Sequence, residues 1–125
     1  HSFPTRALPI YAYGGNLHNV SHGESFIKLV KNRFTGNGLY ILDEPEAALS
    51  PQRQMTLLCL IDELVKQGSQ FIIATHSPIL ISYRDGEILD LNNSFSITKY
   101  EDTEIYQTYK IYLDDPIGMQ HRLFD

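Results

Sequence analysis

Residues 39–45, Leu-Tyr-Ile-Leu-Asp-Glu-Pro, decide how the rest of this chain is interpreted. Four apolar residues run without a break and end in two carboxylates and a proline. A short apolar run that ends in a turn is typical of a strand buried on both faces of a parallel sheet. Because ligands bind at the carboxyl ends of such strands, Asp43 and Glu44 lie where a ligand is expected.

Two carboxylates at this position can divide the work of phosphoryl transfer. One can hold Mg²⁺, a hard cation that prefers oxygen ligands, while the other orients or deprotonates an attacking water. The alternative is an acidic turn that merely leaves the sheet and is solvated. This stretch alone does not separate the two interpretations.

A second strand is predicted at residues 71–74, and Thr75, His76 and Ser77 follow it. Between the two strands, Ser50 and Pro51 form a strong helix start, with serine as the N-cap and proline at the first helical position. The three elements make a βαβ unit, so the strands should run parallel with a right-handed crossover. His76 could then face the same ligand as Glu44; alternatively, it caps or packs against the next helix.

Residues 21–24, Ser-His-Gly-Glu, have the spacing of a capping box at the start of a helix. Apolar residues recur from there at helical spacing: Phe26, Ile27, Val30 and Phe34. The first turn of such a helix offers free N–H groups and a favourable dipole to an anion. The alternative is an ordinary capping box with an incidental glycine.

The flanking segments predict the rest of the architecture. Residues 1–20 are expected to be an irregular leader. Residues 77–83 predict a short helix, and residues 87–91 and 95–100 predict two further strands around a turn. Thr103 is expected to cap a last helix, with an apolar face formed by Ile105, Tyr109, Tyr112 and Leu113.

Composition favours a cytoplasmic protein. At 125 residues the chain is one domain or part of one. The net charge is −5 and the basic residues are scattered, which argues against a dedicated nucleic-acid surface. The single cysteine, Cys59, is expected to be a small core residue in a reducing compartment. No apolar run approaches the roughly 20 residues that span a bilayer, and no signal peptide is evident.

In this order, the motifs resemble the ABC-type ATPase superfamily, most closely the soluble predicted ATPases of the AAA_21 or RecF/SMC-like kind. Residues 20–24 are similar to the signature, 39–44 to the Walker B strand, 47–50 to the D-loop, and His76 to the switch histidine of the H-loop. The resemblance implies an α/β fold: a partial P-loop NTPase fold with a mostly parallel sheet flanked by helices. Residues 21–125 would form the C-terminal part of the ATPase domain, with an antiparallel strand and a helix at its end.

The resemblance also implies ATP and Mg²⁺ as cofactors and assigns roles to individual residues. It places Asp43 at Mg²⁺, Glu44 as the general base, and His76 at the γ-phosphate. The signature would contact the nucleotide of a second subunit in a head-to-tail homodimer that forms with ATP. The residues implied at this nucleotide are Ser21, His22, Gly23, Glu24 and, in the D-loop, Ser50.

Three departures from the family pattern stand out. His22 and Glu24 replace the common glycine and glutamine of the signature, and Ser50 replaces the usual D-loop aspartate. The phosphate-binding loop, GxxxxGK[ST], occurs nowhere in these residues. We therefore expect a truncated chain that is inactive alone. The alternatives are a non-catalytic interaction or regulatory module and the ATPase subunit of a transporter. The biological client, nucleic acid or other, has no signal in this sequence.

Overall fold

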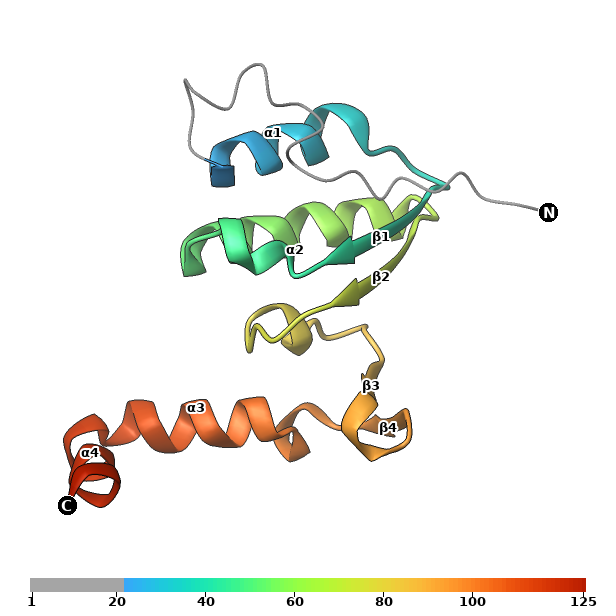
Figure 1. Ribbon diagram of the computed structural model, residues 1–125. Coiled ribbons are helices and arrows are strands. Elements are labelled where there is room, and N and C mark those ends of the chain that lie inside the picture. Colours follow the sequence, from blue (N-terminus) through green and yellow to red (C-terminus); the bar gives the residue numbers. More distant parts are fainter. Residues whose placement is uncertain (1–21) are drawn as a thin grey trace. The chain divides into compact units, whose positions relative to one another are not determined.

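The computed structural model describes residues 22–125, and the chain divides into two units between Thr75 and His76. The first unit contains α1 (His22–Arg33), β1 (Leu39–Asp43), the 3₁₀ helix η2 (Pro45–Ala48), α2 (Pro51–Lys66) and β2 (Gln70–Ala74). The second contains η3 (Leu80–Ser82), β3 (Ile88–Asp90), η4 (Leu91–Asn93), β4 (Ser96–Thr98), η5 (Tyr100–Asp102), α3 (Glu104–Asp114) and α4 (Pro116–Phe124) (Figure 1).

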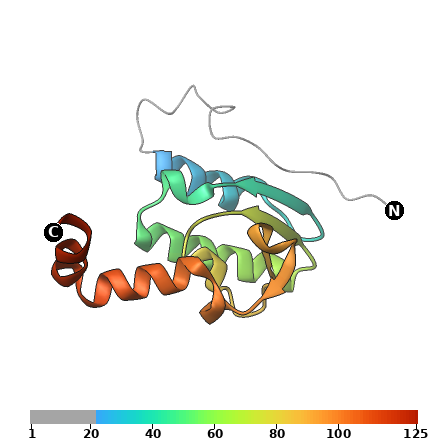
Figure 2. The same ribbon diagram turned by 60° about the horizontal axis from the view of Figure 1, so that its bottom comes forward.

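The βαβ unit predicted from the sequence is present. β1 and β2 pair in parallel with Leu39 opposite Gln70 and Asp43 opposite Ala74. The Ser50 hydroxyl accepts a hydrogen bond from the Arg53 backbone N–H at 3.2 Å, which caps α2 as expected. Figure 2 shows α2 running beside the two strands that it connects. α2 thus connects two parallel strands, and its start is determined by the neighbouring residues Ser50 and Pro51.

The core of the first unit lies between the helices and one face of the sheet. Tyr40 is fully buried there, and its ring stacks on Phe34 with 4.1 Å between the ring centroids. The Tyr40 hydroxyl donates to the Thr35 carbonyl at 2.9 Å. Leu42 on β1 is buried with it, as are these residues of α1 and α2: Phe26, Ile27, Leu29, Val30, Leu57, Ile61 and Leu64.

The prediction that β1 is buried on both faces is wrong. Ile41 and Ile72, which are opposite each other in the register, are 42% and 52% exposed, whereas Tyr40 and Leu42 are buried. The helices of this unit cover one face of the two-stranded sheet. β2 has no second strand neighbour within residues 22–125. Cys59 is also exposed, not a core residue, because it lies off the buried face of α2.

The second unit contains a hairpin and two helices. β3 pairs with β4 in antiparallel fashion, and the two form a sheet of their own. The two strands expected around a turn are therefore present, and they pair with each other in antiparallel fashion. The helix predicted at residues 77–83 is a turn followed by η3, in which the buried Ser77 hydroxyl accepts from the Leu80 N–H at 3.0 Å.

α3 begins where the last helix was predicted to begin, with the Thr103 hydroxyl accepting from the Tyr106 N–H at 3.1 Å. Asp115 caps a further helix, α4, which the sequence analysis did not predict although Asp115 and Pro116 are a local helix-start signal. Neither helix contains a buried residue, so the expected apolar face of α3 is largely exposed.

Burial, with the neighbouring Tyr106 and Glu101, raises the pKa of the Tyr100 hydroxyl, which donates to the Pro78 carbonyl.

Taken together, the small parallel sheet, its helices and the antiparallel strand pair are compatible with a partial P-loop ATPase fold. No helix of the described chain combines the length and apolarity needed to cross a membrane.

Candidate functional site

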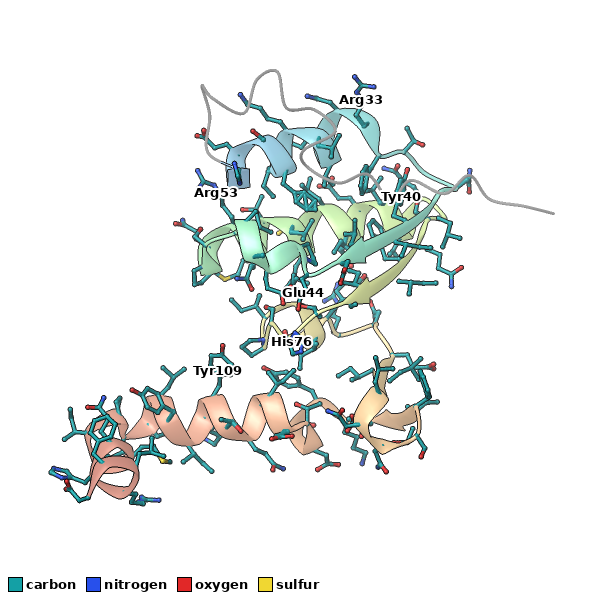
Figure 3. All side chains as sticks on the ribbon, viewed as in Figure 1. Arg33, Tyr40, Glu44, Arg53, His76 and Tyr109 are labelled. Atoms are coloured by element: carbon teal, nitrogen blue, oxygen red, sulfur yellow. The ribbon has the colours of Figure 1, made fainter. Side chains whose placement is uncertain are left out.

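The two predicted carboxylates lie at the carboxyl end of β1 and both are exposed. Asp43 is the last residue of the strand, and Glu44 follows in the left-handed conformation, with φ 47° and ψ 53°. The Glu44 N–H donates to the Ala74 carbonyl at 2.7 Å, which extends the pairing of β1 with β2 by one bond. The turn thus brings Glu44 to the sheet edge with its side chain accessible (Figure 3).

A hydrogen bond that the sequence prediction missed joins the chain beyond both strand ends. The Thr75 hydroxyl donates to the Glu46 carboxylate at 2.6 Å. Glu46 is two residues beyond Glu44, and Thr75 directly precedes His76. The sequence does place an acid and a hydroxyl just after the two predicted parallel strands. Predicting that they form a hydrogen bond requires the register of those strands.

His76 is exposed and is the first residue of the second unit. Its side chain is therefore accessible to a ligand. A shared ligand for His76 and Glu44 stays a prediction.

The signature segment can be followed from His22, since Ser21 lies outside the described residues. His22 is exposed, whereas Gly23 is buried in the first turn of α1. A Cβ atom at Gly23 would lie 2.6 Å from the Ala48 carbonyl oxygen, so the helix start packs directly on the D-loop segment. The start of α1 and the segment at residues 47–50 are thus in contact within this chain.

Glu24, which replaces the common glutamine of the signature, lies beside a basic side chain. A carboxylate oxygen of Glu24 lies 3.6 Å from a guanidinium nitrogen of Arg53 in the first turn of α2. Figure 3 shows Arg53 beside the first turn of α1. Because both side chains are partly exposed, the pair contributes little to stability, but it offsets the negative charge that Glu24 adds at this helix start.

Gly23→Ala tests the contact between α1 and the D-loop. Alanine is the better helix former by about 0.5–1 kcal/mol, so the exchange would ordinarily stabilise a helix. Here the added methyl group meets a backbone carbonyl, and we expect a loss of about 1–3 kcal/mol from overpacking. The free energy of unfolding in urea measures it. His22→Ala, at the exposed neighbouring position, is the control and should not destabilise; an equal gain in both variants would contradict the contact.

Comparison with known proteins decides the family. A model described as an AAA ATPase domain matches residues 19–81, which is half of the chain and contains the carboxylates of β1 and His76. The chain belongs to this ATPase family. The resemblance to ABC-type ATPases inferred from the motifs is confirmed.

Two curated proteins are similar to this ATPase domain. One is the pyoverdine export ATP-binding/permease protein of Pseudomonas fluorescens, 30% identical over 84 residues, which cover 61% of this chain and 13% of that protein. The other is UvrABC system protein A of Lactococcus lactis, 36% identical over 62 residues, which cover 50% of this chain and 6% of that protein. The chain therefore spans a small part of each relative. No solved structure matches it.

The acidic end of β1 fits the cation expected for an ATPase domain. Asp43 and Glu44 present exposed carboxylates, the donor type that Mg²⁺ prefers. Within residues 22–125, no group of three or more acidic, histidine or cysteine side chains could enclose a metal. In proteins, Mg²⁺ is usually held by one or two carboxylates together with substrate phosphates and water.

The candidate residues of the first unit fall into two clusters, and His76 belongs to the second unit. The Walker B-like cluster contains Asp43 and Glu44 with the Glu46–Thr75 hydrogen bond. The signature–D-loop cluster contains Gly23, Glu24 and Arg53. Ser50 belongs to the second cluster as the N-cap of α2, so its hydroxyl has a structural role. Its contact with a nucleotide stays a prediction.

Proposed function

We propose that the natural protein containing this chain hydrolyses ATP with Glu44 as the general base. The observation that supports this most strongly is the pair of exposed carboxylates at the carboxyl end of a parallel strand, inside the segment that matches an ATPase family. In this proposal Asp43 holds Mg²⁺, directly or through water. Bound Mg²⁺ would neutralise charge on the nucleotide phosphates.

Glu44 then orients the attacking water and accepts its proton. A base must come within hydrogen-bond reach of the proton that it removes, so the position of the carboxylate matters as much as its basicity. The backbone of Glu44 is held by the hydrogen bond to Ala74 and by its own carbonyl, which accepts from the Ala47 N–H at 3.1 Å. These bonds hold the backbone from which the Glu44 side chain extends.

The remaining residues are proposed to contact phosphate. His76, accessible directly after the second strand, donates a hydrogen bond to the γ-phosphate. The start of α1 contacts the nucleotide held by a second copy, which makes the active form a head-to-tail homodimer formed on ATP. The residues proposed at this interface are Ser21, His22, Gly23, Glu24 and Ser50. The free N–H groups of a helix start favour an anion there.

The 125-residue chain by itself is expected to be inert toward ATP. It contains no GxxxxGK[ST], the loop whose N–H groups and lysine hold the β- and γ-phosphates. Phosphate release and ATP binding should be measured for the purified chain and for the natural protein that contains it. We expect ATP binding and phosphate release only from the natural protein and not from the purified 125-residue chain. Robust Glu44-dependent turnover by the isolated chain would contradict this expectation, and a natural protein without the loop would favour a non-catalytic module.

A second candidate is the ATPase part of an exporter. The similarity to the pyoverdine export ATP-binding/permease protein supports it. ATPase activity that requires a co-purified or fused membrane-spanning partner would distinguish an exporter from an ATPase that acts without one.

A further inference from the structure

We propose that Glu46 and Thr75 are positioning residues for the general base Glu44. This inference rests on the proposed ATPase function and adds two residues to it. Neither side chain contacts the phosphates in the proposal. Both act through the backbone turn that carries Glu44 out of the sheet.

The carboxyl ends of the two strands are joined by two successive cross-links. The first is the backbone hydrogen bond from Glu44 to Ala74, at 2.7 Å. The second is the side-chain bond from Thr75 to Glu46, at 2.6 Å. Thr75 is the residue directly after β2, and Glu46 lies two residues beyond Glu44. The turn at Glu44 and Pro45 is enclosed between them, and Pro45 is buried. The two bonds therefore restrain the turn from both sides.

The conformation of Glu44 explains why a second cross-link matters. A residue with a side chain at φ 47° is in the left-handed region, which costs about 1–2 kcal/mol for an L-residue other than glycine. Such a conformation persists where the surrounding structure holds it. Two backbone hydrogen bonds, one to Ala74 and one from Ala47, hold this turn, and any relaxation of it would move the Glu44 carboxylate. The Glu46–Thr75 bond resists that relaxation.

The chemistry of this bond distinguishes it from a passive surface contact. A hydroxyl that donates to a carboxylate forms a charge-assisted bond, which is shorter and roughly twice as strong as a neutral one. Glu46 and Thr75 are half-buried, so water competes less for either group than at a fully exposed pair. Thr75 is also covalently joined to His76, so the same bond anchors the backbone from which His76 extends.

The test compares variants of the natural protein that contains this chain. Thr75→Val removes the hydroxyl and keeps the shape, Thr75→Ser keeps the hydroxyl, and Glu46→Gln keeps an acceptor oxygen. We expect Thr75→Val to lower kcat about 10–100-fold, as a small displacement of a catalytic group does, with KM for ATP within about twofold. Thr75→Ser should retain most of kcat, and Glu46→Gln, which keeps the acceptor oxygen but loses the charge, should give a kcat between those of Thr75→Ser and Thr75→Val. Thr56→Val, on α2, is the control and should leave kcat unchanged.

Amide hydrogen exchange provides a readout that does not depend on ATPase activity. We expect the Glu44 N–H to exchange faster in Thr75→Val than in wild type, and Thr75→Ser to restore its protection. Normal kcat in Thr75→Val, or a loss that serine does not rescue, would overturn the positioning role. If the wild-type protein shows no Glu44-dependent hydrolysis, the proposed function fails, while unchanged Glu44 exchange in Thr75→Val would refute the positioning contact independently.

Discussion

Replacing Glu44 with glutamine in the natural protein is expected to lower ATP hydrolysis at least about 100-fold, the range that a general base contributes. Glutamine has nearly the same shape but cannot accept the proton of the attacking water. The hydrogen bond to the Ala74 carbonyl survives, because it comes from the Glu44 backbone. The turn should therefore keep its geometry while the chemistry stops. Steady-state phosphate release measures the effect.

The same variant should also trap the ATP-bound homodimer. If hydrolysis resets the dimer, Glu44→Gln with ATP and Mg²⁺ should elute as a dimer, whereas the wild-type protein should return to monomer as ATP is consumed. Glu63→Gln, an exposed exchange of the same kind on α2, is the matched control and should leave both readouts unchanged. Unimpaired hydrolysis by Glu44→Gln would remove Glu44 from the role of general base.

Local signals in the sequence predicted the part of the fold on which this site depends. Ser50 followed by Pro51 encodes the start of α2 through one hydroxyl and one fixed φ angle, and both act within a few residues. The apolar run before Asp43 predicted a parallel strand that ends in carboxylates, and the register confirms the pairing. Placement of Asp43 and Glu44 at a sheet edge was therefore predictable.

Contacts between distant segments could not be predicted in the same way. The run Leu-Tyr-Ile-Leu has the same pattern whether one face of β1 or both are covered, so the exposure of Ile41 and Ile72 carries no sequence signal. The pairing of Glu46 with Thr75 depends on the strand register, which becomes known only when β1 and β2 are aligned. Likewise, Gly23 had a plausible ligand-binding interpretation, whereas its packing on Ala48 is a tertiary contact.

The largest effect on stability is expected from Tyr40→Ala. Tyr40 is fully buried at the centre of the first unit, stacked on Phe34 and packed 5.2 Å from Phe71 between ring centroids. Truncating a buried aromatic side chain costs about 3–5 kcal/mol through lost contacts and the cavity that remains. Since small domains are stable by only about 5–15 kcal/mol, the variant should be largely or wholly unfolded at modest urea concentrations. Urea unfolding of the 125-residue chain measures the loss.

Tyr40→Phe separates the contribution of the hydroxyl to stability from the contribution of the ring. The hydroxyl donates to the Thr35 carbonyl and accepts from the Thr35 N–H, so it closes the turn between α1 and β1. We expect Tyr40→Phe to cost about 1–3 kcal/mol, because the Thr35 N–H loses its acceptor in a partly buried place, while the Thr35 carbonyl keeps the bond from the Ser69 hydroxyl at 2.7 Å. Tyr109→Ala, on the exposed surface of α3 (Figure 3), is the matched control and should change stability by about 0.5 kcal/mol or less. An equal loss in Tyr109→Ala and Tyr40→Ala would contradict a core centred on Tyr40, because the two positions differ in burial and not in residue type.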